Sequence, residues 1–313
     1  MAVTDFVSYR DRLVDACKKA IVGKNNEITL IAVCYLCGGH ILLEDVPGTG
    51  KTMLFRAFSK ATGSSFKRIQ FTPDVMPSDV TGINFYNMKT GEFEFRPGPV
   101  FASLVLADEI NRATPRTQAS LLEAMAERQV SVDGVTRELG GTFMVAATQN
   151  PIESFGTFPL PEAQMDRFMM KLKLGYMQRG EEIGVALRRD TEKIIDEIEP
   201  VISEEETLGL RAELDSVEIS EVVMGYIMDI IEKTRNDSRF QIGASVRGTI
   251  ALAKTVRAYA AFSGRNFVTP DDVKLLAPYV LAHRLHYRTA VGSAESEETF
   301  KEMLNGIAVP TEE

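Results

Sequence analysis

The feature that most constrains the fold is the stretch HILLEDVPGTGKTMLF, residues 40–55, which reads as an apolar strand, a glycine-rich loop and a helix. This is the context of a phosphate-binding loop, whose usual pattern is G-x-x-x-x-G-K-[ST]. Gly48 and Gly50 let the backbone direct N–H groups toward an anion, and the helix adds its positive end. Lys51 is placed to reach the β- and γ-phosphates, and Thr52 to bind Mg²⁺.

The first glycine of the pattern is absent, because Asp45 stands in its place. Aspartate tolerates unusual backbone angles better than most residues. We expect Asp45 to serve the turn out of the strand, outside the phosphate cradle, with its charge facing away from the nucleotide. The alternative is a chance match at a strand–helix turn.

Apolar runs alternate with helix-like segments through the first half of the chain. Strands are expected at 40–45, 65–71, 102–109, 141–151 and 168–175, and helices at 5–20, 25–38, 51–63 and 118–128. This alternation indicates an α/β fold with a parallel sheet covered on both faces. Two hairpins are expected to interrupt it, at about 82–98 and 129–139, the second with Asp133-Gly134 at its turn.

The second half of the chain reads as helical throughout. Ser203 with Glu206, and Thr269 with Asp272, have the spacing of a helix start. We therefore predict an αβα core over 1–178 and an all-helical domain over 179–313.

Three strand ends carry side chains suited to the same chemistry. Asp108 and Glu109 end the apolar strand LVLADE, where the first acid can hold Mg²⁺ and the second can deprotonate an attacking water. Asn150 ends another strand, and its amide can orient that water or the γ-phosphate. The alternatives without a catalytic role are surface carboxylates for Asp108 and Glu109, and a simple Asn-Pro turn for Asn150.

Two arginines could stabilise charge at the γ-phosphate. Arg167 precedes the last strand, and Arg247 lies near the start of a helix that Ser245 could cap. Spacing alone favours surface ion pairs for both.

Composition argues against nucleic acid or membrane as the main partner. The 313 residues carry a net charge of −9, and no apolar run reaches the roughly 18 residues of a membrane span. The charged N-terminal segment does not resemble a signal peptide, so we expect a cytoplasmic protein. Cys34 and Cys37 form a C-x-x-C inside an apolar run, which favours packing over a metal or redox site. Three scattered histidines are interpreted as structural: His40, His283 and His286.

In order and spacing, these features resemble the MoxR family of AAA+ ATPases, in the branch with an insertion in its second helix. The segments that carry the resemblance run from about residue 21 to 290: IVGKNNEI, LLEDVPGTGKT, RIQFTPDVMPSDVTG, GPVFASLVLADEINRATPRTQASLLEAMAERQV, TQNPIESFGTFPLPEAQMDRF and GASVRGT. The resemblance implies a five-stranded parallel sheet in the order 5-1-4-3-2, followed by a helical lid.

The resemblance also implies roles for individual residues. Lys51 and Thr52 match the Walker A residues, Asp108 and Glu109 the Walker B residues, Asn150 sensor 1, Arg167 an arginine finger that acts on the neighbouring subunit, and Arg247 sensor 2. Val22 and Gly23 match the segment near the adenine. The implied nucleotide-binding set is Val22, Gly23, Val46, Pro47, Gly48, Thr49, Gly50, Lys51, Thr52, Met53 and Arg247, with Thr52 and Asp108 as metal ligands.

The implied function is ATP hydrolysis with Mg²⁺, coupled to chaperone-like remodelling, maturation or activation of a partner protein. Insertion of a metal or cofactor is one form of that task, often with a partner bearing a von Willebrand A domain. A hexameric ring is implied, with the hairpins facing a central pore or the partner. Three alternatives stay open: a nucleotide-gated binding module with little turnover, a small-molecule kinase and a DNA-unwinding motor.

Overall fold

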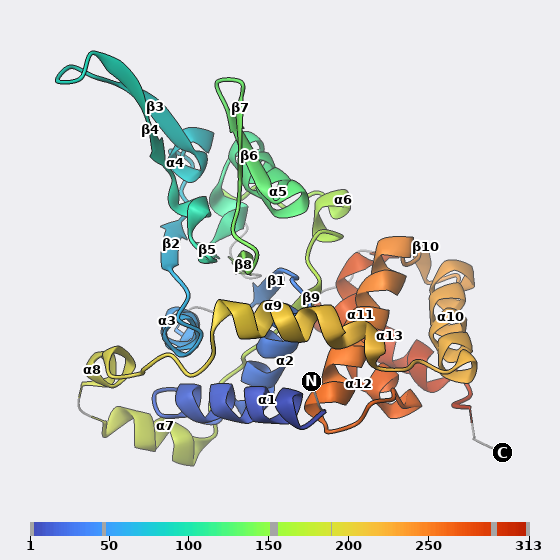
Figure 1. Cartoon of the computed structure of the whole chain (residues 1–313). Coiled ribbons are helices and arrows are strands. Elements are labelled where there is room, and N and C mark those ends of the chain that lie inside the picture. The colour runs from blue at the N-terminus through green and yellow to red at the C-terminus, as the bar shows by residue number, and fades with distance from the viewer. Residues whose placement is uncertain (1–2, 46–47, 151–155, 189, 289–292, 311–313) are drawn as a thin grey trace.

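The computed structural model describes residues 3–45, 48–150, 156–188, 190–288 and 293–310. In these residues, five parallel strands form a central sheet in the order β2 (Phe66–Gln70), β5 (Leu104–Asp108), β8 (Met144–Gln149), β1 (Ile41–Glu44) and β9 (Met170–Leu172). Counted among the parallel strands and followed from β9, this is the order 5-1-4-3-2. The predicted fold class is therefore confirmed, and Figure 1 shows its arrangement.

Alternating side chains of the three inner strands, β5, β8 and β1, enter two separate apolar cores. In β5, Leu104 and Leu106 belong to one core, and Val105 and Ala107 to the other. The first core is shared with α1 (Val3–Lys18), α2 (Asn25–Leu36) and α3 (Lys51–Ala61). The second is shared with α4 (Pro77–Thr81) and α5 (Pro115–Glu127). Burial on both faces explains why these inner strands read as continuous apolar runs.

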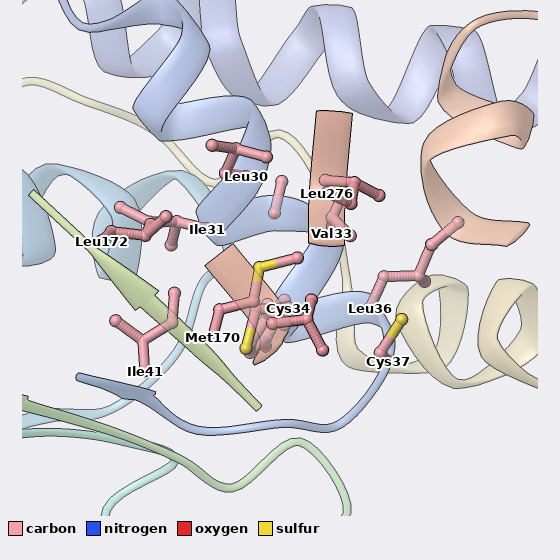
Figure 2. Close-up of a cluster of buried hydrophobic side chains, with 14 of the residues drawn as sticks. Leu30, Ile31, Val33, Cys34, Leu36, Cys37, Ile41, Met170, Leu172 and Leu276 are labelled. Carbon is pink, nitrogen blue, oxygen red and sulfur yellow. The ribbon is translucent and has the colours of Figure 1, made fainter. Parts of the chain in front are cut away.

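The C-x-x-C lies on the buried side of α2 and at its end. Cys34 and Cys37 sit among Leu30, Val33, Met170 and other apolar side chains (Figure 2). Burial raises the pKa of the Cys37 thiol to about 12 and that of Cys34 well above its ordinary value. No group of three or more His, Cys, Asp or Glu in the described residues could hold a metal ion. Both cysteines therefore pack as small apolar residues.

Both predicted hairpins are present and project from the same side of the core (Figure 1). The first is β3 (Gly82–Asn87) with β4 (Glu92–Pro97), and the second is β6 (Gln129–Val132) with β7 (Val135–Glu138). Asn84 Nδ2 donates to Asp133 Oδ2 at 2.7 Å, and the Arg137 guanidinium lies 3.8 Å from the Phe95 ring centre. The two hairpins are thus joined to each other.

The second half is mainly helical: α7 (Arg179–Ala186), α8 (Thr191–Asp196), α9 (Glu204–Glu213), α10 (Glu221–Asn236), α11 (Val246–Phe262), α12 (Pro270–Leu281) and α13 (Ser293–Asn305). Ser203 caps α9, and Thr269 with Asp272 forms a capping box on α12, as predicted. A small pair of strands, β10 (Phe240–Ile242) and β11 (His286–Tyr287), was not expected.

The packing of α8 and α9 bears on the division of the chain. The helix-like stretch after residue 178 is two helices, because Asp190 has a left-handed backbone before α8. Helix α8 contacts α3, and α9 contacts α2, so both lie against the core. The boundary at residue 178 stays a prediction. Among the described residues, no helix has the length and apolar character to cross a membrane.

Candidate nucleotide site

The phosphate loop runs from the end of β1 to the first turn of α3. Gly48 and Gly50 have φ values of 84° and 85°, in the left-handed region that favours glycine. A Cβ at either position would meet no atom within 4 Å, so the loop is open on this side. The N-terminus of α3, which follows directly, is a favourable site for an anion. Val46 and Pro47 lie outside the described residues.

Lys51 is the first residue of α3 and directly follows the loop. Its Nζ donates to the Asp45 carbonyl oxygen at 2.9 Å. Partial burial lowers the pKa of Lys51, and the carboxylates of Asp45, Asp108 and Glu109 oppose that shift. These carboxylates therefore interact electrostatically with the Lys51 ammonium group and favour its charged form.

The Asp45 carboxylate is directed toward the backbone that follows β9. Its Oδ2 accepts hydrogen bonds from Leu174 N at 2.8 Å and Gly175 N at 3.0 Å, and the residue is 8 % exposed. This fits the expectation that Asp45 serves the chain's exit from β1. The residue ties the phosphate loop to the edge strand of the sheet.

The two acids at the end of β5, Asp108 and Glu109, are held by a threonine of the neighbouring strand β8. Thr148 Oγ1 donates to Asp108 Oδ1 at 2.6 Å and accepts from Glu109 N at 2.8 Å. Glu109 has φ 57°, an unusual conformation for a residue with a side chain. One hydroxyl therefore links the Asp108 carboxylate to the Glu109 backbone.

Three further polar residues, which the sequence analysis missed, contact these acids. Arg68 donates to Asp108 Oδ2 through Nη2 at 2.6 Å and Nε at 3.1 Å, and to Gln70 Oε1 at 2.5 Å. Glu109 Oε2 accepts from Gln70 Nε2 at 3.0 Å and from Arg112 Nη1 at 3.1 Å. The alternation of β2 places Arg68 and Gln70 on one face, but their contact with the acids depends on the strand register, which pairs Gln70 with Asp108.

These residues surround a cavity of about 390 Å³. Its described lining includes most of the predicted set, together with the missed Arg68 and Thr148: Asp45, Gly48, Thr49, Gly50, Lys51, Thr52, Met53, Arg68, Asp108, Glu109, Thr148, Gln149 and Asn150. The open loop and the lysine fit a polyphosphate. A threonine hydroxyl and an aspartate carboxylate on the same cavity fit Mg²⁺, which prefers oxygen ligands.

Arg167 and Arg247 lie elsewhere, next to each other. Arg167 precedes β9 and Asp45 follows β1, and these two strands are parallel neighbours. The two positions are therefore at opposite ends of the sheet, about 10 Å or more apart along the strands. Arg247 pairs with Asp166 at 3.5 Å, and both arginines line a separate cavity.

Asp166 is held mainly by Arg284, another residue that was not predicted from the sequence. Arg284 is 6 % exposed and donates to the Asp166 carboxylate, to the Asp166 carbonyl at 2.9 Å and to the Phe168 carbonyl at 2.6 Å. Ser245 Oγ donates to both Asp166 oxygens at 3.1 Å. The start of α11, and Arg247 with it, is thus fixed to the amino end of β9.

Val22 and Gly23 are not among the described residues lining the phosphate cavity. Gly23 has a left-handed backbone, and the Glu181 side chain of α7 lies directly against it. A role for these residues beside an adenine stays a prediction.

Comparison with known proteins matches this fold and site. A family model described as "ATPase family associated with various cellular activities (AAA)" matches residues 40–170, and one described as "AAA lid domain" matches residues 232–303. A solved structure of a putative ATPase from Cytophaga hutchinsonii superposes with a TM-score of 0.88 at 36 % identity, covering 98 % of each chain. The chain is therefore an AAA+ protein with a core and a lid.

Two relatives narrow this class. The chain is 36 % identical to the protein named Chaperone MoxR1 from Mycobacterium tuberculosis, over 96 % of this chain and 82 % of that protein. It is 47 % identical to YeaC of Bacillus subtilis, an uncharacterised protein, over 96 % of this chain and 95 % of that one. The chain belongs to the MoxR family of AAA+ ATPases.

Proposed function

We propose that the protein hydrolyses ATP to ADP and phosphate, at sites completed between neighbouring subunits of a ring, and uses the cycle to remodel a partner protein. The observation that carries the proposal is the division of the site. The phosphate loop, Asp108 and Glu109 share one cavity, whereas Arg167 and Arg247 lie at the other end of the sheet. One chain therefore presents two complementary halves on different surfaces.

The residues in the cavity divide the chemistry among themselves. The loop and Lys51 bind the phosphates, while Thr52 and Asp108 would hold Mg²⁺, which neutralises charge on the phosphate oxygens when bound. Glu109 takes a proton from water as that water attacks the γ-phosphorus, and the bond to the β-bridging oxygen breaks. Asn150 lines the same cavity and can orient the water.

Ring formation follows from the separation of the arginines. An arginine that stabilises the transition state must reach the γ-phosphate, and Arg167 borders no part of its own chain's phosphate cavity among the described residues. A head-to-tail contact that repeats around a closed ring brings each Arg167 to the next subunit's cavity. The family resemblance points to six subunits.

The paired hairpins supply a surface for the partner protein. Met88 is 91 % exposed and Phe93 75 %, and the Tyr86 and Phe93 rings meet edge to face at 5.4 Å. Exposed apolar side chains on a projecting element are typical of a protein-binding surface. The name of the MoxR1 relative, and the family resemblance, support a chaperone task, with metal or cofactor insertion and a von Willebrand A domain partner as its specific form.

Mixing two inactive variants tests the shared site. Lys51→Ala keeps the arginine it offers to a neighbour, and Arg167→Ala keeps its own phosphate loop. Each variant alone should lose nearly all phosphate release. In an equimolar ring with random order, about one interface in four joins an intact loop to an intact Arg167, so roughly a quarter of wild-type activity should return. A mixture no more active than its components contradicts the shared site.

The binding-module alternative is separated by turnover. Glu109→Gln should bind ATP with near wild-type affinity and release no phosphate, because the base is lost and the cradle is kept. The same variant, held with ATP, is the reagent for isolating the partner protein. Wild-type protein that forms rings with ATP yet releases no phosphate, with or without that partner, favours the nucleotide-gated module.

A further inference from the structure

A second cavity, of about 440 Å³, lies between the edge strand β9 and the helices α12 and α13. Lysines come to it from three places: Lys171 and Lys173 from β9 and its end, Lys274 from α12 and Lys301 from α13. Of the described residues that line it, Glu297 is the one acid. The described lining therefore carries a net charge of +3, in a chain whose net charge is −9.

The lysines differ in what neutralises them. Lys171 pairs with Glu44 at 2.7 Å, with both side chains 13 % exposed, and Lys173 pairs with Glu297 at 2.8 Å. Lys274 and Lys301 form no ion pair within the described part of the chain. Ammonium groups gathered on one cavity repel one another, and an anion between them removes that repulsion.

The uncharged residues of the lining indicate which kind of uncharged group would fit beside the lysines. Leu275, Pro278 and Leu304 give the cavity an apolar side, and Tyr279 adds an aromatic ring and a hydroxyl. Burial, with the carboxylates of Glu27 and Glu297, raises the pKa of Tyr279, so its hydroxyl stays a hydrogen-bond donor. The volume falls in the range of small-molecule sites, about 300–1,000 Å³.

We propose that this cavity binds a small organic anion that carries at least two negative charges on an apolar or aromatic body. Lysine ammonium groups act as point charges for phosphate or carboxylate oxygens, and the Leu275 side accepts the body. Phosphate and carboxylate share this chemistry, and both are compared in the test below.

The position of Lys171 connects the cavity to the phosphate loop. Glu44, its partner, is the last residue of β1 and precedes Asp45. The Asp45 carboxylate in turn holds the amides of Leu174 and Gly175, just after the cavity's own strand. An anion that takes Lys171 from Glu44 disturbs the strand end from which the loop begins. The cavity is therefore a regulatory site, an inference that rests on the proposed nucleotide site.

Calorimetry with phenyl phosphate, on full-length protein saturated with ADP and Mg²⁺, tests the binding. Phenol is the uncharged control, and benzoate and phthalate are the carboxylate probes with one and two charges. The double variant Lys274→Glu/Lys301→Glu should bind phenyl phosphate about tenfold more weakly or worse. The matched control Lys19→Glu/Lys89→Glu changes the same charge at exposed positions outside the cavity and should bind as wild type.

The coupling is measured in reverse, as the affinity for a fluorescent ADP with and without saturating phenyl phosphate. By thermodynamic linkage, phenyl phosphate must change the affinity for ADP by the same factor as ADP changes the affinity for phenyl phosphate. Loss of the partly buried Lys171–Glu44 ion pair predicts a change of about two- to fivefold in each affinity. Equal phenyl phosphate binding by wild type and the cavity variant overturns the site. Hexaglutamate serves as a model of an acidic peptide, and its binding at this cavity in place of the small anion also overturns the proposal. Unchanged ADP affinity overturns the regulatory role. A wild type that binds phenyl phosphate here but no ADP refutes the proposed function and leaves the anion site standing.

Discussion

Removing the Asp45 carboxylate should destabilise the fold more than it weakens nucleotide binding. In Asp45→Ala the Leu174 amide, which is buried, loses its acceptor, whereas the half-buried Gly175 amide can turn to water. A buried donor left without a partner costs about 1–3 kcal/mol, and a hydrogen bond to a charged group contributes about 1.5–3 kcal/mol. With partial rehydration at Gly175, we expect a loss of about 2–4 kcal/mol.

Asp45→Asn is the matched variant, because its amide oxygen can still accept one of these hydrogen bonds. It should cost about 1 kcal/mol. Urea unfolding followed by far-ultraviolet circular dichroism measures both variants. Nucleotide affinity, measured with fluorescent ADP, should stay within about threefold of wild type in Asp45→Asn, since the backbone carbonyl that accepts from Lys51 Nζ is kept in this variant. Wild-type stability in Asp45→Ala, or a tenfold loss of affinity in Asp45→Asn, refutes the assigned role.

Two other substitutions test single contacts. Arg68→Gln removes the cation that pairs with Asp108. The two side chains are 45 % and 14 % exposed, so the pair contributes about 1 kcal/mol. Because Arg68 competes with Mg²⁺ for Asp108, its loss should lower the Mg²⁺ concentration for half-maximal hydrolysis roughly two- to fivefold. Lys67→Gln, next along β2 and exposed, should leave it unchanged. Burial, then the charge of Arg128, lowers the pKa of His40 to about 3, below its value near 6.5 in the unfolded chain. The unfolded state therefore binds the proton first, and wild type should lose about 1.4 kcal/mol per pH unit through His40 as pH falls below 6.5. His40→Gln should show a shallower fall in unfolding free energy between pH 6 and 5, and parallel curves contradict the assignment.

Much of the fold and part of the site follow from the sequence, because they depend on contacts that are local or tied to strand ends. The glycines and lysine of the loop form a continuous segment, and Asp108 follows a strand that could only be buried. Parallel strands bring such ends to one edge of the sheet. The caps on α9 and α12 were predictable for the same reason, since three residues suffice to make them.

The rest depends on which elements become neighbours. Arg68 and Gln70 contact the acids only because β2 pairs with β5 in one register. The position of Arg247 depends on a lid whose docking rests on buried Arg284, and nothing in the local pattern of HRLHY indicates that contact. The break between α7 and α8 depends on the left-handed backbone of Asp190. Aspartate adopts this conformation more readily than most residues, but its presence alone does not predict it.

The shared carboxylate of Asp166 has a consequence for timing. It holds the lid through Arg284 and also pairs with Arg247, for which the family resemblance implies a phosphate contact. Arg247 cannot keep that ion pair at full strength while it moves to a second anion. A subunit whose Arg247 engages a phosphate should therefore lose one restraint on its own lid, so that nucleotide contact and lid position change together.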